Sequence, residues 1–160
     1  MAGKEGRGVE IADPDLFRGA PYVLTPEDSA EPRVERFRQL LISIGARAME
    51  FGPTDHDEIV AWTSHLPQIA SSALAARLHQ SLEDDQAAAV AGGGLRDMTR
   101  LAGSSYEMWE GIFQTNHKAL DACLEGYIAE LCEFRKSLQN KNLEKRFDEA
   151  RIFHKQVKTS

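Results

Sequence analysis

Residues 106–138, YEMWEGIFQTNHKALDACLEGYIAELCEFRKSL, carry the pattern that decides the fold. Large apolar side chains recur along this stretch at intervals of three and four positions, with Asn116 continuing the spacing between Phe113 and Leu120. An α-helix places residues spaced in this way on one face. The stretch therefore predicts one long helix whose apolar seam packs against another helix.

Further helical patterns on both sides predict helices over residues 54–78, 95–102 and 143–157. Pro67 lies inside the first of them. Because proline removes a backbone hydrogen bond, we expect a kink at residues 64–68. Three consecutive glycines at 92–94 predict a break before the second helix.

The N-terminal third has a different pattern. Residues 1–20 are rich in glycine, charge and turn formers, which predicts a loop. Two β-prone runs, 22–24 and 46–51, enclose a helical pattern at 34–44. The chain is therefore expected to be mainly α, with a strand-helix-strand segment in residues 1–53 and a helical domain in residues 54–160.

The helices carry more apolar surface than they need for packing among themselves. This suggests that a second subunit completes the core, as in helical bundles that dimerise. A monomer that packs all of the apolar surface internally is the alternative.

The composition excludes several classes of protein. The formal net charge is −6, and Lys and Arg are not clustered as a phosphate backbone requires, so nucleic acid is not an expected partner. Neither a secretory signal nor a run of apolar residues long enough to span a membrane is present. Cys123 and Cys132 read as small core residues of a reduced protein. A cytoplasmic protein is expected.

Local motifs that would indicate a binding or catalytic site are weak. The glycines of GKEGRG at 3–8 have the wrong order for a dinucleotide-binding G-x-G-x-x-G. Asp57, Ser64 and Gln68 share one helical face, which is either a pocket wall or an ordinary solvated surface. Arg100 can pair with Asp97 across three positions, an arrangement suited to gripping a carboxylate but also common on exposed surfaces.

The adjacent pair His56-Asp57 raises a second possibility, a metal-dependent phosphohydrolase. Such a site needs further His and Asp ligands, and the other histidines show no ligand spacing, so no metal is expected. No local signature of a Ser-His-Asp or Cys-His nucleophile is present either.

Taken together, four segments resemble the prephenate and arogenate dehydrogenase family. They are LFRGAPYVLTP at 16–26, TDHDEIVAWTSHLPQ at 54–68, GGGLRDMTRLAGS at 92–104, and Met108-Trp109 with the following IFQTNH. The resemblance implies the helical dimerisation domain of these oxidoreductases of tyrosine and aromatic amino acid biosynthesis, with a fold like the C-terminal domain of 6-phosphogluconate dehydrogenase. It also implies an intertwined homodimer.

The resemblance further implies a set of substrate-binding residues. Arg100 corresponds to the arginine that grips the substrate carboxylate, with Asp97 and Glu5 as its ionic neighbours. Ser64 and His65 correspond to the pocket wall. The full set expected to bind substrate is Arg100, Ser64, His65, Gln68, Asp97, Gly93, Trp109, Lys4 and Glu5. Within it, Gly93 and Trp109 correspond to positions that reach the pocket of the partner subunit.

In this family a nucleotide-binding domain comes first, and the resemblance places the catalytic His just before Met1. The complete enzyme is expected to use NAD or NADP, and residues 1–160 alone are expected to bind neither and to be inactive. Prephenate, arogenate or tyrosine is the expected ligand. Gln68 stands where the family often has His, which leaves the preference between prephenate and arogenate open. A non-enzymatic dimerisation or regulatory module is the rival hypothesis.

Overall fold

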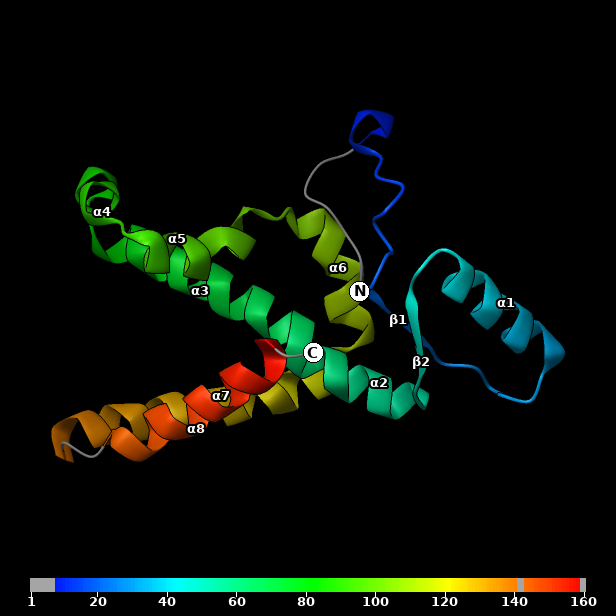
Figure 1. The fold of residues 1–160 in the computed structure, drawn as a ribbon. Coiled ribbons are helices and arrows are strands. Elements are labelled where there is room, and N and C mark those ends of the chain that lie inside the picture. The colour runs from blue at the N-terminus through cyan, green and yellow to red at the C-terminus, as the bar shows by residue number, and fades with distance from the viewer. Residues whose placement is uncertain (1–7, 141–142, 159–160) are drawn as a thin grey trace. The chain divides into compact units, whose positions relative to one another are not determined.

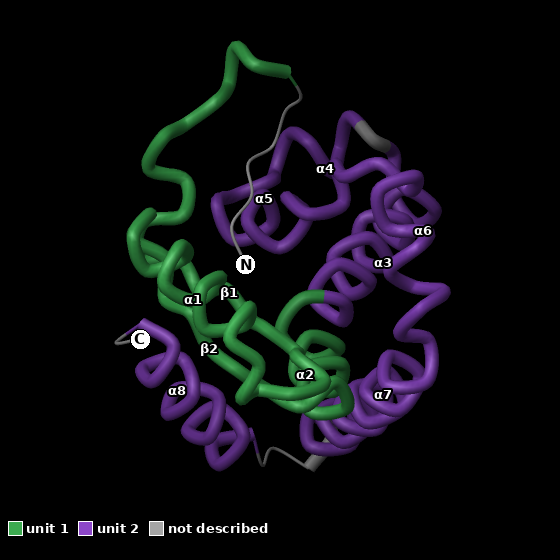
Figure 2. Tube along the Cα trace, turned by 90° about the vertical axis from the view of Figure 1, so that its right-hand side faces the viewer, with its two compact units in different colours: residues 1–64 green, residues 65–160 purple. Residues whose placement is uncertain are grey.

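The structure, a computed structural model, describes residues 8–140 and 143–158, and most of these residues are helical (Figure 1). The chain forms two compact units, residues 1–64 and residues 65–160 (Figure 2). The predicted mainly α class is confirmed. The division falls between Ser64 and His65, whereas the predicted domain boundary lies between residues 53 and 54; the functional assignment of those two parts stays a prediction.

The first unit contains the predicted strand-helix-strand segment. β1 (Pro21–Leu24) pairs in parallel with β2 (Arg47–Glu50). Parallel strands need a crossover, and α1 (Pro32–Ser43) supplies it. Gly45 ends this crossover with a φ of 83°, a left-handed conformation that favours glycine. The prediction for this segment is confirmed to within one or two residues at each boundary.

A charged cluster ties α1 to β2. Arg38 on α1 forms ion pairs with Glu50 on β2 and, at 3.2 Å, with Glu35 one turn earlier. Ser29 Oγ donates a hydrogen bond to Glu50. The hydrogen bonds from Ser29 and Arg38 hold the pKa of the Glu50 carboxyl below its usual value. The crossover helix is thus fixed to the sheet by charge as well as by apolar contact.

The helix predicted over 54–78 consists of three successive helical segments. These are α2 (Pro53–Val60), the π-helical turn Ala61–His65, and α3 (Leu66–Ser81). Pro67 has no N–H to donate to the carbonyl of Thr63, which agrees with a helix that loses its regular pattern at this point. The expected disturbance is therefore present, as a wide turn just before Pro67 instead of a kink centred on 64–68.

The predicted break at Gly92 to Gly94 is wrong in its position. The chain leaves α4 (Asp84–Val90) and enters α5 (Gly93–Thr99), so Gly93 and Gly94 form the first turn of a helix. The N–H groups of a first turn need no partner within the helix, and α5 packs against α3. Beyond Thr99 the expected helix over 95–102 tightens into a 3₁₀ segment, η3 (Arg100–Gly103).

The single long helix expected over 106–138 is also wrong. It is divided into α6 (Tyr106–Thr115) and α7 (His117–Asn140), because Asn116 leaves the helical conformation with φ −109° and ψ 25°. The side chain of Asn116 is buried and bonds to His65, a contact that a periodicity argument does not include. A tertiary hydrogen bond thus accompanies the interruption of the helix.

α8 (Glu144–Lys158) contacts α7 through its first turn, and its bounds agree with the prediction over 143–157. Phe134 and Phe147 meet edge to face, with ring centroids 6.4 Å apart. The guanidinium of Arg146 lies 5.6 Å from the Phe134 ring centroid and pairs with Glu130 and Glu133 of α7. These contacts join the first turn of α8 to the C-terminal half of α7.

Much apolar surface of the second unit remains exposed. Its buried apolar residues include Leu66, Leu120 and Cys123, which agrees with Cys123 as a small core residue. Exposed large apolar residues gather on α6, α7 and α8: Tyr106, Met108, Ile128, Leu131, Leu138, Phe147, Ile152, Phe153 and Val157. No helix within residues 8–140 or 143–158 is both long and apolar enough to cross a membrane.

Candidate substrate-binding site

A row of polar side chains is buried on one face of the helix that begins after the π-helical turn. His65, Gln68 and Ser71 follow one another at intervals of three residues, and their exposed fractions are 8%, 4% and 4%. Buried polar groups in folded proteins are almost always hydrogen-bonded, because an unpaired one loses its water without compensation. This row therefore requires partners from other elements.

The segment η3 provides two of these partners. Gln68 Nε2 donates to the carbonyl oxygen of Leu101 at 2.9 Å and, more weakly, to Ser72 Oγ at 3.3 Å. The backbone N–H of Ala102 donates to Ser71 Oγ at 3.1 Å. The polar face of α3 thus binds the main chain of η3. These bonds fix the backbone position of η3, from whose first residue, Arg100, the guanidinium side chain extends.

The third partner comes from the break between α6 and α7. Asn116 Nδ2 lies 3.2 Å from His65 Nδ1, and both side chains are buried. Because an amide nitrogen donates, His65 accepts at Nδ1 and its remaining proton lies on Nε2. Asn116 is a site residue that the sequence did not reveal. Its one signal is that it is an amide in an otherwise apolar seam.

Aromatic rings cover His65 on another side. Trp109 meets His65 edge to face at 6.2 Å between ring centroids, and Phe113 stacks on Trp109 at 5.4 Å. The structure therefore brings Trp109 against His65 within one chain. The expectation that Trp109 also reaches the pocket of a partner subunit stays a prediction.

Two buried polar atoms in this region lack a hydrogen-bond partner among the described residues: Gln68 Oε1 and Trp109 Nε1. The first is an acceptor and the second is a donor. Atoms of this kind in an otherwise satisfied region indicate a site that a ligand or water completes.

Two charged residues of the predicted site, Arg100 and Asp97, are on the surface of the second unit. Arg100 is exposed at the start of η3, and Asp97 is exposed on α5. Gly93, at the start of α5, is open: a methyl group added to it would meet no described atom within 4 Å. The structure thus brings Arg100 into the same unit as His65, Gln68 and Trp109, while the predicted pairing of Asp97 with Arg100 stays a prediction.

Three predicted site residues remain, one in the first unit and two outside the described residues. Ser64 is half-buried and is the last residue of the first unit, directly before His65 in the chain. Lys4 and Glu5 lie outside the described residues. Their proposed contacts with substrate remain untested.

The His56-Asp57 pair is a local contact in the first unit, with Nδ1 of His56 3.0 Å from Oδ1 of Asp57. Among the described residues, no group of three or more His, Cys, Asp or Glu side chains is arranged to hold a metal ion. The pair has the geometry of an ordinary contact between neighbours.

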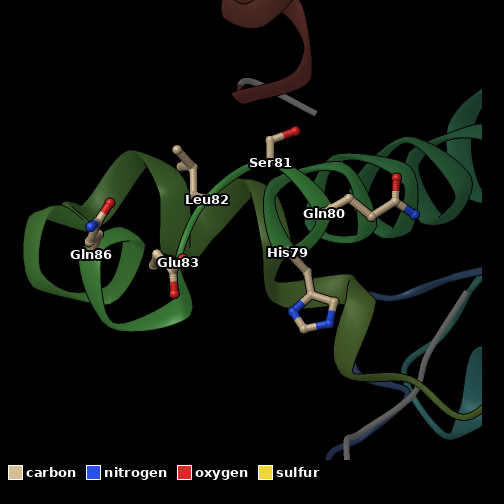
Figure 3. Close-up of a pocket in the computed structure, with 6 residues that line it drawn as sticks. All are labelled: His79, Gln80, Ser81, Leu82, Glu83 and Gln86. Carbon is tan, nitrogen blue, oxygen red and sulfur yellow. The ribbon is translucent and has the colours of Figure 1, made fainter.

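An open hollow lies at the end of α3, well separated along the chain from this row. It has a volume of about 520 Å³ and is lined by His79, Gln80, Ser81, Leu82, Glu83 and Gln86 (Figure 3). The side chain of His79 points to one side of the turn, whereas Ser81 and Leu82 point to the other (Figure 3). No residue of the predicted site lines this hollow.

The family model described as the dimerization domain of prephenate dehydrogenase matches residues 52–152. The chain belongs to this family. The resemblance that the sequence motifs carry is thereby confirmed, and with it the assignment to an oxidoreductase family.

Known members of the prephenate dehydrogenase family extend the match. The prephenate dehydrogenase of Bacillus subtilis is 32% identical over 149 residues, which are 92% of this chain and 40% of that protein. The chain therefore spans about two fifths of the length of this relative. The phosphohydrolase and the non-enzymatic module are not favoured by these matches.

Solved structures of the family agree with the fold. Arogenate dehydrogenase from Synechocystis is 29% identical with a TM-score of 0.80, covering 99% of this chain and 58% of its own. Prephenate dehydrogenase from Aquifex aeolicus, in complex with hydroxyphenyl propionate and NAD+, is 25% identical with a TM-score of 0.87, covering 98% of this chain and 57% of its own. The helical domain of these dehydrogenases is thus the fold of this chain.

Proposed function

We propose that this chain is the substrate-binding and dimer-forming part of a prephenate dehydrogenase-like enzyme of tyrosine biosynthesis. The reaction is the oxidative decarboxylation of prephenate or arogenate, in which the cyclohexadienyl ring gives a hydride to NAD or NADP and loses carbon dioxide. The cofactor is assigned to the complete enzyme, which acts in the cytoplasm, and not to residues 1–160 alone. The NAD+ bound to the Aquifex aeolicus relative supports this proposal.

The observation that carries the proposal is the docking of η3 on the buried polar face of α3. The bonds to Leu101 and Ala102 hold the backbone on which Arg100 stands. A guanidinium presented from a fixed backbone binds a carboxylate through two parallel hydrogen bonds. We therefore assign Arg100 as the group that binds the substrate carboxylate.

The remaining residues take supporting roles in this proposal. His65 and Gln68 form the wall of the pocket beside Arg100, and the family resemblance assigns Ser64 to substrate binding as well. Asp97, Lys4 and Glu5 are the polar and charged groups at its mouth, while Gly93 and Trp109 extend toward the pocket of a partner subunit.

We propose that the protein is a homodimer. The exposed apolar residues of α6, α7 and α8 form a large surface whose contact with water is unfavourable. The same surface on a second copy of the chain can cover it. The name of the matched family, a dimerization domain, supports this assignment.

The proposal is tested by titrating the complete natural protein, loaded with the reduced cofactor NADH or NADPH so that no hydride can be transferred, with prephenate, arogenate and tyrosine in a calorimeter. Binding of at least one ligand is expected. Arg100→Ala should weaken it about 100-fold or more, because a bidentate bond to a charged group is lost. Arg96→Ala, one turn away on exposed α5, is the matched control and should bind normally.

Equal loss of binding in the two variants would show a general charge effect, and unchanged binding by Arg100→Ala would refute the role of Arg100. If none of the three ligands bound to the unmodified protein, the proposed function itself would be wrong.

A further inference from the structure

The orientation of the Gln68 amide is fixed by its partners. The carbonyl oxygen of Leu101, 2.9 Å away, can only accept a hydrogen bond, so the nitrogen of the amide must face it. The same nitrogen also faces Ser72. A flipped amide would set two oxygens against each other at this distance, and therefore Oε1 points away from Leu101.

This leaves an acceptor buried without a donor. Gln68 is 4% exposed, and its Oε1 has no hydrogen-bond partner within residues 8–140 and 143–158. Removing an amide oxygen from water without a new bond is costly, so the position favours any group that brings a donor. A group that brings only lone pairs, such as a carbonyl, is disfavoured there.

The chemical group that donates to Gln68 Oε1 is inferred from the position of Arg100. Leu101, which holds the Gln68 amide, directly follows Arg100 in η3. In an α-amino acid, the ammonium and the carboxylate are attached to the same carbon. Since Arg100 is next to Leu101 in the chain, one such ligand would use both groups, with its carboxylate on Arg100 and its ammonium on Gln68 Oε1. A 2-oxo acid places a carbonyl oxygen where the ammonium would be.

Resting on the proposed function, we propose that Gln68 makes this site select an amino acid over the 2-oxo acid of the same skeleton. The ammonium donates to Gln68 Oε1 while Arg100 holds the carboxylate. Trp109 Nε1, the second buried atom without a partner in the described chain, is a donor beside His65 and suits an oxygen of the same ligand. Among the substrates of the proposed reaction, this selects arogenate over prephenate.

The test compares two ligands that differ at one group. L-tyrosine and its 2-oxo counterpart, 4-hydroxyphenylpyruvate, share the ring and the carboxylate and differ in bearing an ammonium or a carbonyl. Each is titrated into the complete natural protein loaded with NAD or NADP, and 3-(4-hydroxyphenyl)propionate, which has neither group, is the reference. We expect tyrosine to bind about 10- to 100-fold more tightly than the oxo acid, the range for a hydrogen bond to a charged group.

Gln68→Met removes the acceptor and keeps a side chain of similar length. It also removes the amide bond that anchors η3 and Arg100, so it should weaken the binding of all three ligands, and that of tyrosine about tenfold more than that of the oxo acid and the propionate. Gln80→Met, the same change at an exposed position on α3, is the matched control and should change none of the three affinities.

The outcomes separate this inference from the function on which it rests. If the oxo acid binds as tightly as tyrosine, a water satisfies Gln68 Oε1 and the inference is wrong, while the proposed function stands. If none of the three ligands binds, both are wrong. The comparison in the unmodified protein decides the matter even if Gln68→Met fails to fold.

Discussion

Gln68 and Leu101 lie 33 positions apart in the sequence and are joined by a hydrogen bond of 2.9 Å from the side-chain amide to the backbone carbonyl. Together with the bond between Ser71 and Ala102, it attaches η3 to α3. The position of the proposed carboxylate-binding arginine is thus set by the buried face of a different helix. Changes on that face are expected to alter both stability and binding.

Ser71→Ala tests the second of these bonds. The substitution leaves the N–H of Ala102 without its acceptor in a half-buried position, which should lower the free energy of unfolding by about 1–3 kcal/mol. The measurement is urea denaturation followed by circular dichroism. Ser81→Ala, at the exposed last residue of α3, is the control and should change stability by less than about 0.5 kcal/mol. Equal effects of the two substitutions would contradict the docking role of Ser71.

The lowered pKa of Glu50 predicts part of the pH dependence of the free energy of unfolding. Because its pKa in the folded protein lies below the usual value of 4.5, its contribution is fully present above that value and is lost as the pH falls through the lower, folded pKa. Glu50→Gln should therefore reduce the loss of stability on acidification below about pH 5. The urea midpoint measured between pH 6 and pH 3 tests this.

Glu58→Gln, an exposed position on α2, is the control for the loss of a carboxylate. If this control and Glu50→Gln had the same acid profile as the unmodified protein, Arg38 and Ser29 would not be stabilising the Glu50 carboxylate in solution.

Leu131→Glu tests the dimer surface. Leu131 is 50% exposed on α7 beside other exposed apolar residues, and a charge buried there on association would lack a partner. The variant should be monomeric, or dissociate at a concentration at least about tenfold higher, in light-scattering or ultracentrifugation measurements. Lys118→Gln, which makes the same change in net charge at an exposed position of α7, should remain dimeric. A dimeric Leu131→Glu variant would place the interface elsewhere.

The sequence predicted those parts of the fold whose signals are local. The strand-helix-strand segment follows from two β-prone runs, and Pro32 and Gly45 mark the ends of the helix between them. α8 follows from its own periodicity. In each case the residues that determine the structure lie within the element that they form.

The errors occurred where distant residues decide the structure. Asn116 continues the helical spacing of its neighbours, yet its amide binds His65, 51 positions earlier, and the helix breaks there. Gly93 and Gly94 suggest a break, yet they open a helix that packs against α3. No periodicity within a window of the chain contains these contacts.

The same limit applies to the site. Ser64 and Gln68 were recognisable as one polar helical face, but the spacing alone favoured an ordinary solvated surface. The burial of Gln68 and its bond to Leu101 exclude that interpretation for this residue. Arg100 was selected by family resemblance, since its spacing from Asp97 is also common on exposed surfaces and its own position in η3 is exposed.

The attachment of η3 to α3 also has a consequence for how this family can diverge. On the η3 side, both bonding atoms belong to the main chain, the carbonyl of residue 101 and the N–H of residue 102. The contact itself places no demand on the side chains at those two positions, with proline at 102 as the exception because it has no N–H. The cost of changing the contact falls on positions 68 and 71 instead. An exchange at position 68 would therefore alter ligand preference and the anchoring of the arginine in a single mutational step.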